Sequence, residues 1–310
     1  MQLHGKNILI LTISGDRTTN KVLKFLTKTK FLRVNDTDQA DVSINDMGNI
    51  EIKINDNKFI DEINIGKIWY RIGNVFRTHD YQNHLIKPIV IKEEIHFNDF
   101  IYYYLERRFE VLGSITSEFT LNKLIVLFQA KARGLTIPFS NISNSKNIEI
   151  TQPDFFVKSI TNFTPFEFNG FRYGPIYSML PCSTYTFNSI SFYQNYIDKI
   201  FEVRTFYLYG EFYSMAIFSQ NNPNTKMDYR NSDGSKPNRN VPIKLPTDLE
   251  NKLNALMTDL NLNSGSIDLI YSKSKEFIFL EVNPSGQIDW LSTDCNYYIE
   301  KKIARYLDET

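Results

Sequence analysis

Gly265-Ser-Ile-Asp268-Leu-Ile-Tyr271 and Glu276-Phe-Ile-Phe-Leu-Glu281-Val-Asn283-Pro284-Ser285-Gly286 are the stretches that decide the fold. Both are rich in apolar residues and of strand length, and a charged turn joins them, so they predict two neighbouring strands. Side chains alternate along a strand, which places Glu281 and Asn283 on one face. The two strands therefore bring three oxygen-bearing side chains together beside the turn that starts at Pro284.

Oxygen donors of this kind indicate a magnesium site. Mg²⁺ prefers hard oxygen ligands and commonly binds one or two carboxylates together with substrate phosphates. An isolated Asp or Glu in a strand is more often a solvated residue of an exposed face, and this plain alternative stays open. Both carboxylates here lie inside apolar runs, however, and a buried carboxylate without a cation would be costly. Asp268, Glu281 and Asn283 are therefore the predicted metal ligands.

The sequence from Asp268 to Gln287 resembles the metal-binding end of the ATP-grasp superfamily. Its closing Asn283-Pro-Ser-Gly-Gln287 is similar to that of the graspetide synthetases, which comprise microviridin-type peptide ligases and the peptide maturases of grasp-with-spasm systems. Further, weaker matches are spread over residues 65–300. One departure concerns Arg71, which is followed by Ile72 where members of the family often carry a second basic residue. Because that second basic residue is missing, the resemblance does not carry over a role in peptide recognition to the first lobe.

The resemblance implies an α/β (α+β) chain with the ATP-grasp fold, in which an N-terminal open α/β lobe accompanies two lobes that grip the nucleotide. The implied boundaries are 1–112 for the N-terminal pre-ATP-grasp lobe, 113–196 for the central lobe and 197–310 for the C-terminal lobe with the metal and phosphate site. A hairpin over residues 163–178 of the central lobe is the candidate for docking a leader peptide. Internal packing of the same hairpin is the alternative.

Hydrophobic periodicity and turn residues predict the individual elements. The strand at 7–13 followed by a helix at 17–29 indicates an open α/β sheet. Further strands or hairpins are predicted at 49–60, 67–71, 154–158, 166–173, 191–196 (as a short edge) and 202–217, further helices at 87–109, 122–134, 247–260 and 294–308, and a mobile polar loop at 219–244.

The resemblance also assigns residues to the nucleotide. Lys123 and Lys158 correspond to its two nucleotide-contacting lysines, although a lysine at a helix start or strand end is usually a solvated cap. The segment Gln194-Asn-Tyr196-Ile197-Asp198 is similar to the hinge that binds adenine, with Asp198 placed for the ribose. Tyr196 and Ile197 are equally compatible with ordinary core packing. Glu202 follows the hinge and completes the predicted nucleotide contacts.

Two arginines are the predicted catalytic residues. By the resemblance, Arg204 would hold the γ-phosphate and the developing acyl-phosphate, and Arg230 would close over the substrate carboxylate from a loop. Arginine suits both roles because its planar fork binds phosphate or carboxylate oxygens in a bidentate manner.

The implied function is that of an ATP- and Mg²⁺-dependent peptide ligase. It would activate Asp or Glu side chains of a ribosomal precursor peptide as acyl-phosphates and form ω-ester or ω-amide macrocycles with Ser, Thr or Lys. One alternative is an ATP-grasp ligase that adds an amino acid to a carboxylate, like glutathione synthetases or glutamate ligases. The other is a catalytically silent, nucleotide-gated peptide-binding protein. The latter is disfavoured because Lys158, Arg204, Asp268, Glu281 and Asn283 are all present.

Composition sets the remaining expectations. The 35 basic and 35 acidic residues cancel, so neither nucleic acid nor a membrane surface is expected as a partner. Cys182 and Cys295 lie far apart without metal-ligand spacing, which disfavours a disulfide framework and fits a reducing cytoplasm. The apolar stretch Ile8–Ile13 is too short for a signal peptide or a membrane span. Homodimers are common among symmetric oligomers, and the resemblance favours the same assembly.

Overall fold

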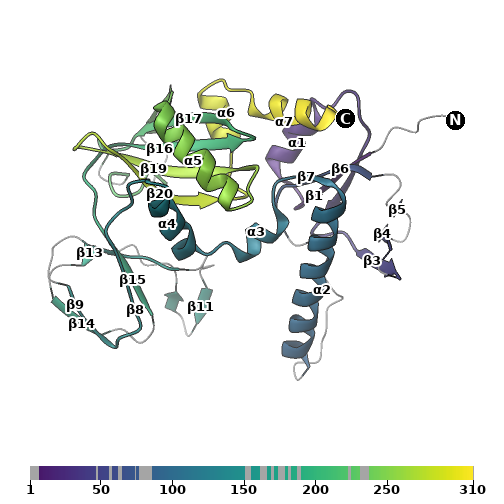
Figure 1. The fold of residues 1–310 in the computed structure, drawn as a ribbon, viewed down its shortest axis with the longest axis horizontal. Helices are drawn as coiled ribbons and strands as arrows, with labels where there is room; N and C mark the ends of the chain where they lie inside the picture. Colours follow the sequence, from purple (N-terminus) through teal and green to yellow (C-terminus); the bar gives the residue numbers. More distant parts are fainter. Residues whose placement is uncertain are drawn as a thin grey trace.

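The computed structural model describes residues 7–46, 48–55, 58–61, 65–73, 75–76, 86–150, 155–160, 166–168, 171–173, 179–180, 183–186, 190–222, 225–230 and 237–309. Its larger sheets follow one another along the chain: a parallel sheet, a small antiparallel sheet and a long antiparallel sheet (Figure 1). None of the described helices is both long and apolar enough to cross a bilayer.

The N-terminal sheet is parallel and has the order β2-β1-β6-β7, formed by β1 (Asn7–Thr12), β2 (Phe31–Asn35), β6 (Ile65–Tyr70) and β7 (Glu110–Leu112). Its central strand β1 is buried on both faces. Ile8 and Ile10 belong to one hydrophobic core, whereas Leu9 and Leu11 belong to another. A continuous apolar run is typical of such a doubly covered parallel strand. The predicted open α/β sheet is confirmed.

Helices and a small sheet surround this parallel sheet. They are α1 (Arg17–Leu23), α2 (Lys87–Arg108), α3 (Ile115–Thr120) and the antiparallel strands β3 (Ala40–Asn45), β4 (Asn49–Ile54) and β5 (Lys58–Asp61). The helix predicted over 17–29 ends at Leu23, so the prediction was wrong for residues 24–29. The backbone N–H groups of Thr27 and Thr29 donate to the carboxylate of Asp308, at 3.0 Å each, instead of continuing the helix.

The central sheet has the order β13-β10-β15-β8, formed by β8 (Ser140–Ser143), β10 (Phe155–Val157), β13 (Met179–Leu180) and β15 (Ser191–Asn195). Beside it lie the antiparallel pairs β9 (Asn147–Ile150) with β14 (Ser183–Thr186), and β11 (Phe166–Phe168) with β12 (Phe171–Tyr173). The prediction of β15 as an edge was wrong, because β10 and β8 pair with its two sides. Its first four residues are buried accordingly.

The C-terminal sheet is antiparallel and has the order β18-β17-β16-β19-β20. Its strands are β16 (Lys199–Leu208), β17 (Glu211–Phe218), β18 (Arg239–Ile243), β19 (Ser264–Ser272) and β20 (Phe277–Asn283). Its two faces pack into different cores. Val203 of β16 packs in a core with α4 (Lys123–Ala132) and α5 (Thr247–Asp259), whereas Phe206 packs in the core that contains α7 (Ile299–Asp308). Helix α7 also lies beside α1 (Figure 1), so the C-terminal helix joins the first and last sheets.

Two further predictions need correction. The helix expected over 294–308 begins only at Ile299, as α7, because Asn296 and Tyr298 have left-handed φ values of 53° and 52° that a right-handed helix cannot contain. A separate short helix, α6 (Asp289–Asp294), precedes it. The polar loop expected over 219–244 contains β18, whose pairing with β17 was not visible in its Asn- and Pro-rich sequence. Cys182 and the predicted turns at 56–57 and 169–170 lie outside the described residues.

Candidate active site

A cavity of about 420 Å³ opens between the central and C-terminal sheets. Its lining comes from α4, β10, β15, β16, β19 and β20, and from the segment 227–230 between β17 and β18. The volume falls within the range of roughly 300–1,000 Å³ that is typical of small-molecule sites. Elements that are distant in the sequence thus converge on one partly open cavity.

The predicted hinge lines this cavity. Gln194, Tyr196 and Ile197 are among its wall residues, together with apolar side chains of α4 such as Val126 and Leu127. Gln194 is buried, and its Nε2 donates to Ser140 Oγ at 2.9 Å. The lining therefore combines an apolar surface, of the kind a flat aromatic base needs, with a fixed backbone segment beside it.

Four cationic residues line the same cavity: three are predicted site residues, and the fourth, Lys199, pairs with Glu202. Lys123 begins α4, Lys158 follows β10 directly, and Arg230 lies on the segment after β17. The backbone N–H of Lys158 donates to the carbonyl of Phe192 at 2.8 Å, which fixes the base of its side chain. Burial lowers the pKa of the Lys158 ammonium, and the charges of Lys123 and Arg230 lower it further, whereas Glu281 raises it. Arg230 pairs with Asp228, and Lys123 lies near Glu281. Lys158, in contrast, has no ion-pair partner among the described residues, so its buried ammonium favours an anion beside it.

The predicted metal ligands also come together. Asp268 on β19 and Glu281 on β20 are direct register partners, and Asn283 closes the same strand. All three line the cavity, and Glu281 Oε2 lies 3.9 Å from Lys123 Nζ. The described residues hold no group of three or more His, Cys, Asp or Glu side chains placed for a metal. Two carboxylates and an amide oxygen nevertheless fit Mg²⁺, because this ion commonly takes its other ligands from phosphate and water.

Arg204 and Asp198 lie differently from the other predicted residues, since neither is among the described residues that line the cavity. Arg204 on β16 is buried, and its Nη1 donates to both carboxylate oxygens of Asp268 at 2.8 Å. Asp198 is exposed and pairs with Lys273, whose Nζ lies 3.2 Å from its carboxylate. Arg204 is therefore attached to the metal site through Asp268, whereas Asp198 faces another partner.

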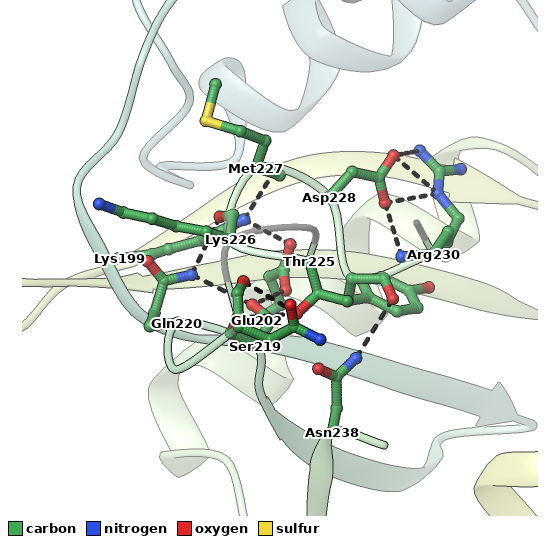
Figure 2. A network of polar contacts seen from close by, with 12 residues as sticks. Lys199, Glu202, Ser219, Gln220, Thr225, Lys226, Met227, Asp228, Arg230 and Asn238 are labelled. Atoms are coloured by element: carbon green, nitrogen blue, oxygen red, sulfur yellow. Dashed lines mark hydrogen bonds and ion pairs between the residues drawn. The ribbon is translucent and has the colours of Figure 1, made fainter. Parts of the chain in front are cut away.

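A buried polar network in the cavity wall was not predicted from the sequence, although Glu202, one of its members, is a predicted site residue (Figure 2). Lys199 Nζ donates to Glu202 Oε1 and to the carbonyl of Met227, and Ser219 Oγ donates to Glu202 Oε2 at 2.7 Å. A sequence signal did exist, namely two opposite charges inside the apolar start of β16. The register shift between Lys199 and Phe201, which shapes this contact, could not be seen in the sequence.

Arg71 connects the N-terminal sheet to the turn that follows β20. This residue follows β6, and its Nη1 donates to the carbonyl of Ser285 at 2.7 Å. Its Nε lies 3.7 Å from the carboxylate of Asp16, at the start of α1. The carboxyl edge of a parallel sheet is the usual position for functional loops. Here that edge holds the turn that follows the metal ligands.

Comparisons with known proteins identify this fold. No protein-family model and no curated protein sequence matches the chain. Among solved structures, a RiPP-associated ATP-grasp ligase from Chryseobacterium gregarium, in complex with ADP and a leader and core peptide, is 19% identical with a TM-score of 0.77. That alignment covers 98% of this chain and 96% of the ligase.

Two macrocyclases from Microcystis aeruginosa MRC also have structures similar to this chain. MdnC, bound with precursor peptide MdnA, is 21% identical with a TM-score of 0.74, and MdnB is 22% identical with a TM-score of 0.75. Each alignment covers 98% of this chain and 100% of the macrocyclase. The chain therefore has the ATP-grasp fold over nearly its whole length, as the resemblance of its C-terminal strands predicted.

Proposed function

We propose that the protein is an ATP-dependent ligase that activates a carboxylate as an acyl-phosphate. The observation that carries this proposal is the convergence of Lys123, Lys158 and Arg230 with Glu281 in one cavity beside the hinge. A polyphosphate among the three cations would relieve their mutual repulsion. ADP is the anion named with the Chryseobacterium ligase, which shares the fold.

Each lobe has a part in this proposal. In the C-terminal lobe (197–310), Asp268, Glu281 and Asn283 would hold Mg²⁺, which when bound neutralises phosphate charge. In the central lobe (113–196), the hinge from Gln194 to Ile197 would receive the adenine, and Lys123 and Lys158 the phosphates. The N-terminal lobe (1–112) supports the metal turn through Arg71. For Asp198 to bind the ribose, it would have to leave Lys273.

The reaction follows from this arrangement. An oxygen of the substrate carboxylate attacks the γ-phosphorus of ATP, the bond to the β-phosphate oxygen breaks, and ADP leaves. A hydroxyl or amine then attacks the acyl carbon, loses its proton and expels inorganic phosphate, which retains one of the carboxylate oxygens. Lys158 and Arg230 stabilise the transferring charge, and Arg204 orients Asp268. Positioning and charge stabilisation supply most of the catalysis in such transfers.

The proposed substrate is a ribosomal precursor peptide. Two solved structures of the same fold contain peptides by name: the Chryseobacterium ligase a leader and core peptide, and MdnC the precursor peptide MdnA. The activated group would be an Asp or Glu side chain, and the nucleophile a Ser or Thr for an ω-ester or a Lys for an ω-amide. The antiparallel pair of β11 and β12 belongs to the region proposed to dock the leader. A cytoplasmic homodimer is the proposed setting.

Isotope transfer tests this chemistry. Precursor peptide whose Asp and Glu carboxylates carry ¹⁸O is incubated with the protein, ATP and magnesium, and the released phosphate is analysed by mass spectrometry. The proposal expects ADP and phosphate with one labelled oxygen for each bond formed. Production of AMP and pyrophosphate, or of unlabelled phosphate only, would contradict acyl-phosphate formation. In a parallel reaction supplied with free amino acids, a peptide that gains the mass of one of them would instead support the amino-acid ligase alternative.

A further inference from the structure

The ion pair of Lys199 and Glu202 stands out among the charged groups around the cavity. The Lys199 side chain is 3% exposed and that of Glu202 is 10% exposed, in a strand whose neighbouring side chains are largely apolar. Burial raises the pKa of Glu202, and Lys199 counteracts that effect. A buried pair of this kind contributes little net stability compared with apolar residues of similar size. The pair is therefore a candidate for a role other than stability.

The pair is tied to the segment that carries Arg230. In Figure 2, Lys199 bonds the carbonyl of Met227 as well as Glu202, with a distance of 2.9 Å between Lys199 Nζ and Met227 O. The other carboxylate oxygen of Glu202 accepts from Ser219, and the carbonyl of Ser219 accepts from Thr225 Oγ1 at 2.9 Å. Both ends of the segment Thr225–Met227 are thus attached to β16 and the end of β17.

The next three residues of the chain lie at the cavity. Asp228, Tyr229 and Arg230 all line it, and the Asp228 carboxylate accepts hydrogen bonds from the Arg230 guanidinium at 2.7–3.1 Å. On the far side, Asn238 Nδ2 donates to the carbonyl of Tyr229 at 3.2 Å. Arg230 itself is 56% exposed, so its place depends on how the backbone before it is held.

We propose that Lys199 and Glu202 are positioning residues that hold Arg230 over the cavity through the backbone of Met227. This inference rests on the proposed function, because it concerns how the proposed substrate-binding arginine is placed. Lys199 lies two residues after Ile197 of the hinge, so the nucleotide wall and the arginine segment share one anchor. Lys199 and Glu202 both line the cavity, and the resemblance implies a nucleotide contact for Glu202. Because both of its carboxylate oxygens already accept hydrogen bonds from Lys199 and Ser219, we assign Glu202 to the arginine segment instead.

Three variants separate positioning from folding. Lys199→Met removes the tie to Met227 but leaves a buried carboxylate unpaired. Lys199→Met combined with Glu202→Leu also removes that carboxylate, so it should regain stability without restoring the tie. Thr225→Val removes only the hydroxyl that bonds Ser219 O. Lys252→Met is the matched control, because Lys252 forms an exposed ion pair with Asp248 on α5, away from this network.

Two measurements are made on each variant of the full chain. Hydrogen exchange of the amides in residues 225–230 reports the anchoring without requiring any activity. Affinity for ADP, together with kcat and KM for a precursor peptide encoded beside the gene, reports the consequence. The double variant is expected to exchange faster at 225–230. Its kcat/KM for the peptide should fall by about 10- to 100-fold, because a misplaced catalytic group costs about that much in rate. Its ADP affinity should stay within about twofold of that of the Lys252→Met control.

Three outcomes would overturn the inference. Exchange at 225–230 equal to that of the control would show that the pair does not anchor the segment. Full recovery of kcat/KM in the double variant would mean that the pair serves stability alone. A loss of ADP affinity as large as the loss of kcat/KM would make Glu202 a nucleotide contact. If the unmodified protein neither binds ADP nor converts the peptide, the proposed function fails, whereas the exchange measurement still decides whether the pair anchors the segment.

Discussion

Substitution of Gly286 by alanine is a direct test of the turn that follows the metal ligands. A Cβ at this position would lie 2.2 Å from Ser266 Oγ, 2.3 Å from Ser266 Cβ and 2.8 Å from Arg204 Nη2. The first two distances are far below van der Waals contact. Ser266 is 1% exposed and lies on β19, so its Cβ cannot move without the strand. Relief therefore requires the turn and β19 to separate.

The cost should be that of overpacking a buried site. Such insertions typically destabilise by ~1–3 kcal/mol, and the two sub-3 Å contacts with Ser266 place Gly286→Ala near the upper end of that range. The melting temperature should fall by several degrees, measured by differential scanning fluorimetry. Because Arg204 holds Asp268, displacement of its Nη2 should also weaken magnesium-dependent turnover. Gly48→Ala is the control, since its Cβ would come no closer than 3.3 Å to Asn45 O.

A second substitution sharpens the test. Ser266→Gly removes the atoms at 2.2 and 2.3 Å and leaves only the contact with the end of the flexible Arg204 side chain. In the Ser266→Gly background, Gly286→Ala should therefore cost less than about 1 kcal/mol, a strong non-additivity in a double-mutant cycle. The steric reasoning is refuted if Gly286→Ala is as stable as the unmodified protein, or if the two substitutions are simply additive.

Three further predictions follow from the charged groups of the site. Lys158→Met should lose ATP binding in calorimetry yet raise the melting temperature of the nucleotide-free protein at pH 7, because burial lowers the pKa of this lysine and its charge opposes folding. The gain should shrink as pH rises through the lowered pKa toward the unfolded value near 10.4, and a constant gain would contradict the assignment. Arg71→Met should destabilise by about 1–3 kcal/mol in urea unfolding, since it leaves the Ser285 carbonyl without its donor, and unchanged stability would show that this contact is not maintained. Glu281→Gln should abolish ligation with the melting temperature nearly unchanged, so full activity would rule out Glu281 as a metal ligand.

Elements whose burial is complete were the easiest to predict. The apolar runs of β1, β19 and β20 gave their strands directly, because a strand covered on both faces or in a core needs apolar residues at most positions. The prediction that Asp268 and Glu281 lie on neighbouring strands was confirmed, but their direct pairing depends on a register shift between Asp268 and Leu269, without which Asp268 would lie opposite Leu280. The nucleotide residues required the family resemblance, since a lysine at a strand end has no distinguishing local pattern.

Features set by distant partners could not be predicted. β15 is interior because β8 and β10 approach it from different parts of the chain. The pairing of Arg204 with Asp268 depends on the register of β16 against β19. The network of Lys199 and Glu202 depends on a register shift and on where the chain after β17 returns to the sheet. Tertiary contacts of this kind override what local spacing indicates.

Intact mass of a precursor peptide is the most direct measurement of the central claim. A precursor encoded beside the gene is incubated with the protein, ATP and magnesium, and parallel reactions omit ATP or the metal. The account predicts the loss of one or more water molecules from the peptide in the complete reaction and no change in either omission. A peptide of unchanged mass, in a reaction where the protein binds ATP and the peptide, would contradict the proposed macrocyclisation.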